Sequence, residues 1–171
     1  WLHQEQMPTA FVFNPRLSVR QLFDFMLADF GIPCETQSKS QVLMKLNHWL
    51  LARYRAGQTA VLVIDEAQNL SPEALEEIRL LTNLETSTEK LLVVILAGQP
   101  EFAERLNEPG LRQLKQRVAL RCEIAPFQIS ETAAYIGSRI RTAGGESQLF
   151  TREAVMAIAL GVFVIAFAVY T

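Results

Sequence analysis

Two unbroken runs of apolar residues, each followed closely by polar side chains, place the tightest constraint on how this chain folds. The first run is Ala60–Ile64, which precedes Asp65 and Glu66; the second is residues 91–97, followed by a glycine and Gln99. A strand with one face in water alternates apolar and polar residues, whereas a strand covered on both faces is apolar along its length. The first run therefore predicts a central strand of a parallel sheet, and the second predicts a further strand of the same sheet.

Helical patterns alternate with strand patterns along the chain. Three helices are expected around the first run: one from Ser18 to Gly31, one over about residues 40–56, and one that begins at Ser71 and Pro72. The remaining elements are strands at residues 10–13 and about 118–124, and a helix from Ser130 to about Arg141. This alternation predicts an α/β fold with a parallel sheet, in which ligands bind beyond the carboxyl ends of the strands.

Asp65 and Glu66 give the sharpest chemical signal. Their position puts one carboxylate at a strand end and the next at the start of a loop, on the edge where a magnesium nucleotide would bind. In phosphoryl-transfer ATPases the first such acid holds magnesium and the second orients the attacking water. A solvated acidic pair in a surface loop is the alternative for so short a pattern.

Composition narrows the class of protein. The 171 residues are enough for one domain, half of them are apolar, and 16 basic residues nearly balance 18 acidic ones. A sequence pI near 5.8 argues against a nucleic-acid binder that relies on charge. Cys34 and Cys122 lack a metal-binding spacing and no signal-peptide pattern precedes them, so we expect two reduced packing residues in the cytosol.

Five segments, in order along the chain, share the motifs of one family. They are residues 13–18 (FNPRLS), 61–70 (VLVIDEAQNL), 80–86 (LLTNLET), 94–102 (VILAGQPEF) and 111–118 (LRQLKQRV). Over about residues 10–157 the chain closely resembles AAA+ ATPases of the general secretion pathway protein A type. The letters DEAQ also resemble those of DEAD/DEAH helicases, but Gly98-Gln99-Pro100 stands where helicases have a Ser-Ala-Thr-like motif.

The resemblance implies a P-loop NTPase-like three-layer sandwich with a parallel sheet, here as a partial AAA+ core, and it gives roles to individual residues. Asp65 matches the Walker B residue that binds Mg²⁺, and Glu66 matches the carboxylate that polarises water. Gln99 stands at the place of the sensor 1 residue that contacts the γ-phosphate of ATP. A turn residue before Pro100 is the alternative interpretation of Gln99.

Arg117 stands where such families have an arginine that reaches the nucleotide of a neighbouring subunit, so the resemblance also implies a homo-oligomer. A cation there would offset the charge that develops on the transferred phosphoryl group. Arg117 also belongs to a basic cluster between Arg112 and Arg121. A solvated helix face, or an ion pair with Glu104 or Glu108, explains this cluster equally well. The basic residues are too few to predict a nucleic-acid surface.

The chain departs from the family at its phosphate-binding loop. The Gly-x-x-x-x-Gly-Lys-Ser/Thr loop occurs nowhere in the 171 residues. We therefore expect a fragment that lacks this Walker A loop, binds ATP weakly or not at all, and is inactive alone. The expected organisation is a partial nucleotide-hydrolysing core over residues 1–127, the start of a helical lid over 128–153, and an apolar tail over 154–171.

The tail is the second departure. Residues 154–170 carry no charge, and only Gly161 falls outside the apolar class. In the family, the rest of the helical lid and the sensor 2 arginine follow at this point. This chain has the apolar residues instead. Three interpretations stay open: a membrane span of about 26 Å, short for a hydrocarbon core of ~30 Å; a buried helix or strand; and a sequence that has left the frame of the family.

The resemblance implies that the intact parent protein is an ATP hydrolase that couples hydrolysis to a conformational change in an oligomer. Its expected role is in secretion or assembly of the cell envelope, in the cytoplasm or at the inner face of the bacterial inner membrane. ATP and Mg²⁺ are the expected cofactors, a secretion or envelope protein is an expected partner, and nucleic acid is not. The alternatives are a DNA-transposition ATPase of the TniB/MuB kind, which shares this core, and a non-catalytic remnant.

Overall fold

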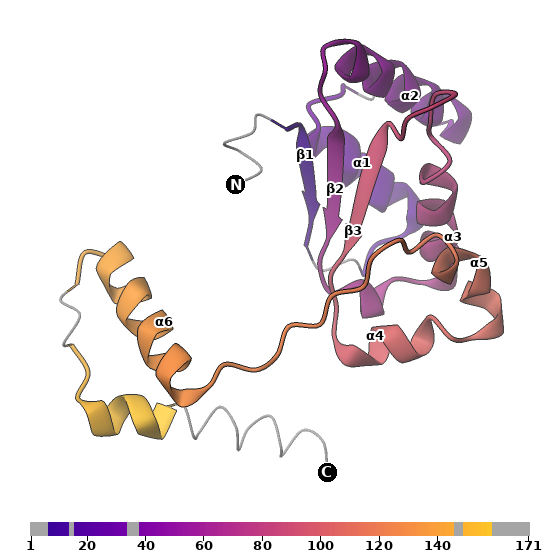
Figure 1. The fold of residues 1–171 in the computed structure, drawn as a ribbon. Helices are drawn as coiled ribbons and strands as arrows, with labels where there is room; N and C mark the ends of the chain where they lie inside the picture. Colours follow the sequence, from indigo (N-terminus) through magenta and orange to yellow (C-terminus); the bar gives the residue numbers. More distant parts are fainter. Residues whose placement is uncertain (1–6, 14–15, 34–37, 146–148, 159–171) are drawn as a thin grey trace. The chain divides into compact units, whose positions relative to one another are not determined.

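The computed structural model describes residues 7–13, 16–33, 38–145 and 149–158. The chain forms two compact units, Trp1–Leu120 and Arg121–Thr171. The first unit contains a three-stranded sheet with its helices, which are labelled in Figure 1. The division expected from the sequence, with boundaries after residues 127 and 153, stays a prediction.

The sheet is parallel and has the strand order β1-β2-β3, with bounds Thr9–Val12, Ala60–Ile64 and Leu92–Leu96. β2 is the central strand, and all five of its residues are buried. Its register is set on one side by pairs such as Ala10 with Leu62. The central place of β2 explains its unbroken apolar run, and the α/β fold class with a parallel sheet is confirmed.

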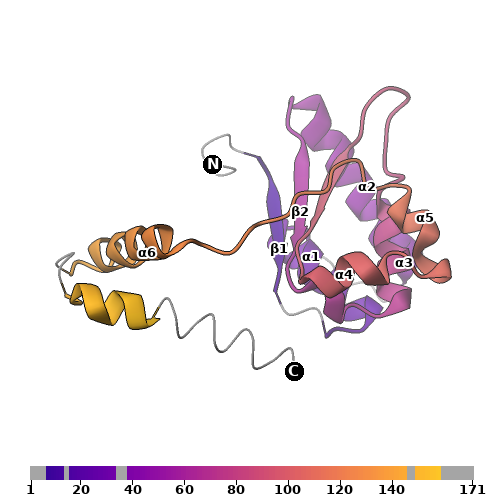
Figure 2. The same ribbon diagram turned by 60° about the horizontal axis from the view of Figure 1, so that its bottom comes forward.

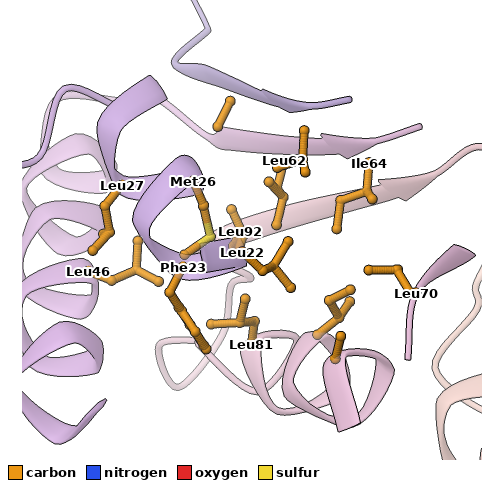
Figure 3. Close-up of a cluster of buried hydrophobic side chains, with 14 of the residues drawn as sticks. Leu22, Phe23, Met26, Leu27, Leu46, Leu62, Ile64, Leu70, Leu81 and Leu92 are labelled. Atoms are coloured by element: carbon orange, nitrogen blue, oxygen red, sulfur yellow. The ribbon is translucent and has the colours of Figure 1, made fainter. Parts of the chain in front are cut away.

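One face of the sheet packs against helices to form the core. These helices are α1 (Val19–Asp29), α2 (Lys39–Arg55) and α3 (Pro72–Leu81). Figure 2 shows all three on the same side of β1 and β2. In Figure 3, Leu22 and Met26 of α1 lie beside Leu62 and Leu92 of the sheet. Full burial of one such side chain contributes about 1.5–3 kcal/mol, so this face is the main source of stability in the first unit.

The opposite face of the sheet is also apolar. Val61 and Val63 of β2 are buried there, whereas Phe11, Val93 and Ile95 on the flanking strands are 40–43% exposed. Alternation along each strand and the register between strands put these five side chains on one face. In the part of the chain that the structure describes, this second face stays partly open to solvent.

Serine caps begin two of the helices, as the sequence predicts. Ser18 and Gln21 form a capping box at the start of α1. At the start of α3, Ser71 Oγ accepts a hydrogen bond of 3.2 Å from the backbone N–H of Ala74, and Pro72 is the first helical residue. These local signals are strong because each satisfies backbone donors that a helix start leaves without partners.

Short helical segments follow the strands, and longer ones form the second unit. The short segments are η1 (Ala67–Asn69), α4 (Pro100–Arg105), η2 (Pro109–Leu111) and α5 (Arg112–Lys115). The second unit contains α6 (Ile129–Thr142), and residues 152–158 are helical as well. None of the helices within the described ranges has the length and apolarity that a membrane crossing requires. Residues 159–171 lie outside those ranges, so the three interpretations of the tail stay open.

The strand expected at residues 118–124 is wrong. This segment has no regular secondary structure, and Leu120 and Ile124 are 78% and 95% exposed. The described residues place only β1, β2 and β3 in the sheet, and none of them pairs with this segment. A strand must exchange backbone hydrogen bonds with a neighbour, so an apolar run without one stays irregular.

Two smaller expectations about the second unit are also wrong. The helix cap is Gln128 and not Ser130, because the Glu131 carboxylate accepts a hydrogen bond of 2.7 Å from the backbone N–H of Gln128. Ser130 therefore lies inside the first turn of α6. Cys122 is exposed and does not pack in a core, and Cys34 lies outside the described residues.

Candidate active site

The candidate site lies at the carboxyl ends of β2 and β3. Backbone hydrogen bonds join the two strand ends: Ala97 N donates to Ile64 O (2.9 Å), and Ala67 N donates to Ala97 O (2.8 Å). The segments that follow the two strands consequently begin side by side. Asp65 and Glu66 follow β2, and Gln99 is three residues beyond the end of β3.

Asp65 is half-buried at the end of β2. Its backbone N–H donates to Val12 O of β1 at 3.0 Å, and its own Oδ1 accepts the N–H of Glu66 at 2.8 Å. These two bonds fix both the backbone and the carboxylate at the strand end. Asp65 is therefore presented from a rigid element, as a metal or phosphate site requires.

The donor set around Asp65 suits magnesium. Among the described residues no group of three or more His, Cys, Asp or Glu side chains gathers into a metal cage. Mg²⁺ keeps several waters and binds one or two protein carboxylates together with substrate phosphates. The half-buried carboxylate of Asp65 at the strand end agrees with that preference, so Asp65 could hold the ion.

Glu66 has an unusual backbone. Its φ of 52° and ψ of 39° lie in the left-handed region, and it is the one non-glycine residue with positive φ among those described. This conformation costs roughly 1–2 kcal/mol for an L-residue and persists only where neighbouring contacts enforce it. Such strain is common at active sites. The left-handed backbone of Glu66 is therefore consistent with a catalytic role for this residue.

Gln68 and Arg105 supply contacts that enforce this turn. Gln68 Nε2 donates to Glu66 Oε2, and Gln68 Oε1 accepts the backbone N–H of Gln99 at 3.2 Å. Arg105 of α4 donates through Nη1 to the backbone oxygens of Gln68 (2.9 Å) and Leu70 (2.8 Å). The turn after β2 is thus bonded to the segment after β3 by one carboxamide and one guanidinium.

Gln99 is exposed and occupies the N-cap position of α4, where its side chain makes no capping hydrogen bond. Only its backbone N–H is used for the contact with Gln68. The side chain is therefore accessible to a ligand at this edge of the sheet. Gln68 thus connects Glu66, which follows β2, with Gln99, which follows β3, and the roles expected of Asp65, Glu66 and Gln99 stay predictions.

Arg117 lies elsewhere in the first unit. It is exposed and follows α5. The hydrogen bond and charge of Lys90 lower the pKa of Glu85, and the charge of Arg117 lowers it further, so Arg117 lies within electrostatic range of Glu85. Glu85 precedes β3 and is near its amino end, whereas Asp65 follows a carboxyl end. The role expected of Arg117 stays a prediction.

Residues 1–106 match the family described as an AAA domain. This chain belongs to that family. The match includes Asp65, Glu66 and Gln99, and it confirms the resemblance seen in the sequence motifs. The AAA domain family implies nucleotide binding.

One curated relative and several solved structures are similar to this AAA domain. The relative is general secretion pathway protein A of Aeromonas hydrophila, 39% identical over 159 residues, which covers 90% of this chain and 29% of the relative. The chain thus spans less than a third of the length of that relative.

Two solved structures with a similar fold are an ORC2 protein and a CDC6P protein. The ORC2 protein of Aeropyrum pernix, in its ADPNP and ADP complexes, has a TM-score of 0.64 at 14% identity over 93% of this chain and 50% of that one. The CDC6P structure from Pyrobaculum aerophilum has a TM-score of 0.59 at 16% identity over 92% of this chain and 42% of that one. At such identities the likeness shows the fold.

Sequence reasoning missed Gln68 and Arg105. The signal for Gln68 was an amide three residues after the strand-end carboxylate of Asp65, together with a glycine directly after the neighbouring strand run. Arg105 gave no signal, because its two acceptors are backbone oxygens more than 30 positions away in the chain.

Proposed function

We propose that this AAA domain is the catalytic part of an ATPase of the general secretion pathway protein A kind. The observation that carries the proposal is the convergence of Asp65, Glu66 and Gln99 at the carboxyl edge of a parallel sheet in an AAA fold. The work proposed for the whole protein is to couple ATP hydrolysis to a conformational change in a homo-oligomer.

Each site residue has a distinct role in this proposal. Asp65 holds Mg²⁺, which when bound neutralises charge on the β- and γ-phosphates. Glu66 orients the attacking water and polarises it. The accessible carboxamide of Gln99 contacts the γ-phosphate. Arg117 acts on the nucleotide of a neighbouring copy.

The relative from Aeromonas hydrophila supports the cellular role. Its name places it in general secretion, and 90% of this chain aligns with it. We accordingly propose a role in secretion or cell-envelope assembly, in the cytoplasm or at the inner face of the inner membrane. The nearly balanced charge of the chain disfavours a nucleic-acid partner.

Titration of nucleotide tests the proposal. The full-length gene product that contains these residues should bind Mg-ATP with micromolar affinity and hydrolyse it, and Asp65→Asn should lower hydrolysis and raise the Mg²⁺ concentration that hydrolysis requires. The 171-residue chain alone, which lacks the Gly-x-x-x-x-Gly-Lys-Ser/Thr motif, should show no micromolar affinity in calorimetry. A full-length product that neither binds nor hydrolyses ATP would refute the proposal in favour of a non-catalytic remnant.

A further inference from the structure

Gln68 is bonded at both ends of its carboxamide within the candidate site. Its Nε2 donates to the carboxylate of Glu66, and its Oε1 accepts the backbone N–H of Gln99. Glu66 belongs to the turn after β2, and Gln99 belongs to the start of α4 after β3. One planar amide therefore connects the two segments that form the site.

The partners of the amide fix its orientation. A carboxylate offers only acceptors, and a backbone N–H offers only a donor. The opposite orientation would place Gln68 Oε1 against the Glu66 carboxylate and the NH₂ group against the N–H of Gln99, and both hydrogen bonds would be lost. Only the observed orientation satisfies all three groups.

Gly98 leaves the space in which the carboxamide lies. A Cβ at this position would lie 2.8 Å from Gln68 Oε1 and 3.4 Å from Ala67 N. The first distance is shorter than van der Waals contact, so a larger residue at position 98 would displace the end of the Gln68 side chain. The connection thus depends on close packing of Gln68 against the segment after β3.

Arg105 fixes the other end of Gln68. Its guanidinium donates to the backbone oxygens of Gln68 and Leu70, at 2.9 and 2.8 Å. The Gln68 backbone is consequently anchored to α4, and the freedom that remains lies in the side-chain torsions. Movement at the start of α4 would therefore be passed to the carboxamide.

We propose that Gln68 is a positioning residue that couples the catalytic carboxylate of Glu66 to the segment that contacts the γ-phosphate at Gln99. The inference rests on the proposed ATPase function and adds a regulatory link within the same site. A phosphate that moves Gln99 also moves Oε1 of Gln68, which accepts the Gln99 N–H. Nε2 of Gln68 moves with it and changes the orientation of the Glu66 carboxylate. The Glu66 carboxylate therefore faces the attacking water only when Gln99 contacts the γ-phosphate.

Kinetics of a near-isosteric variant test the coupling. Gln68→Met keeps the length of the side chain and removes both hydrogen bonds. In the full-length gene product kcat should fall about tenfold while KM stays within about twofold, because misplacing a catalytic group by 1 Å costs up to 10²-fold. Gln113→Met, at an exposed glutamine of α5, is the matched control and should leave kcat unchanged. A wild-type kcat in Gln68→Met would overturn the coupling.

A double-mutant cycle with Gly98 tests whether the packing acts through Gln68. Gly98→Ala should lower kcat several-fold in the wild-type background, because the new methyl group displaces the carboxamide. The same substitution should have no further effect in Gln68→Ala, since the displaced group is then absent. Additive losses would mean that Gly98 acts independently and would contradict the proposal.

Amide hydrogen exchange in the 171-residue chain tests the contact without ATP. In Gln68→Met the Gln99 N–H should exchange about tenfold faster, whereas the N–H of Ala97, bonded to Ile64 O, should not change. Unchanged exchange at Gln99 would overturn the proposal whatever the ATPase result. If Gln99 responds but the full-length product hydrolyses no ATP, the proposed function fails, and the catalytic role of Gln68 fails with it although the contact stands.

Discussion

The two units of the chain differ in what surrounds their apolar side chains. In the first unit, buried apolar residues from Ala10 to Leu114 form a cluster across the sheet and helices. In the second, α6 has no buried residue, and Leu149 and Phe150 are 67% and 44% exposed. A helix satisfies its backbone within itself, whereas a strand needs a neighbour. Among the described residues, helices therefore form in both units, whereas the strands of the sheet form where β2 gives them a partner.

The largest expected difference is in the cost of removing an isoleucine from each unit. Ile64→Ala empties a fully buried position on β2 and should destabilise the protein by about 2–5 kcal/mol. Ile124→Ala, at a position that is 95% exposed, should change stability by less than about 0.5 kcal/mol. Urea unfolding of the two variants measures both values, and similar costs would mean that residues 118–124 pack in solution.

Two arginines provide the next contrast. Arg105→Met removes donors from the backbone oxygens of Gln68 and Leu70 and should cost about 1–3 kcal/mol. Arg121→Met breaks only an exposed pair with Glu123 and should cost at most about 1 kcal/mol. Thermal unfolding followed by circular dichroism separates the two variants. Equal effects would refute the anchoring role of Arg105.

Helix caps give a smaller contrast. Ser71→Ala removes the acceptor for the Ala74 N–H at the start of α3 and should destabilise by about 1 kcal/mol. Ser130→Ala lies inside the first turn of α6 and should be neutral or stabilising by under about 0.5 kcal/mol. Chemical denaturation of both variants checks the assignment of Gln128 as the cap, which a loss in Ser130→Ala would contradict.

The smallest effect concerns exposed ion pairs. The hydrogen bond from Arg79 lowers the pKa of Glu76 below its ordinary value. A lowered pKa in the folded state adds stability that is present above the unfolded pKa and is lost as the pH falls through the folded pKa. Melting curves from neutral pH into the acid range should thus show slightly less acid sensitivity in Glu76→Gln than in wild type.

At neutral pH, Glu76→Gln and Glu123→Gln should both melt close to wild type, because exposed pairs contribute little in either unit.

Sequence patterns predicted those features that depend on near neighbours. The apolar run of Ala60–Ile64 predicted the central strand, and Ser71 and Pro72 predicted the start of α3. The positions of Asp65, Glu66 and Gln99 after the two strands follow from the order of residues along the chain, and their roles stay predictions. These signals act over a few residues or follow from parallel topology.

The features that the sequence did not predict depend on distant partners. Residues 118–124 have the composition of a strand, but a strand edge beside them is a property of the fold and not of the segment. The bonds from Gln68 to Gln99 and from Arg105 to Gln68 join residues 31 and 37 positions apart. A local pattern can mark Gln68 and Gly98 as unusual, but it does not specify which distant residue is the partner.

ATP hydrolysis by the full-length gene product with a single carboxylate replaced tests the central claim most directly. Glu66→Gln should lower kcat at least about 100-fold and leave Mg-ATP binding intact, because a catalytic base contributes 10²–10⁴-fold to the rate. Glu73→Gln, at an exposed glutamate in the first turn of α3, should keep the wild-type kcat. Wild-type hydrolysis by Glu66→Gln would contradict the assignment of the site at the ends of β2 and β3.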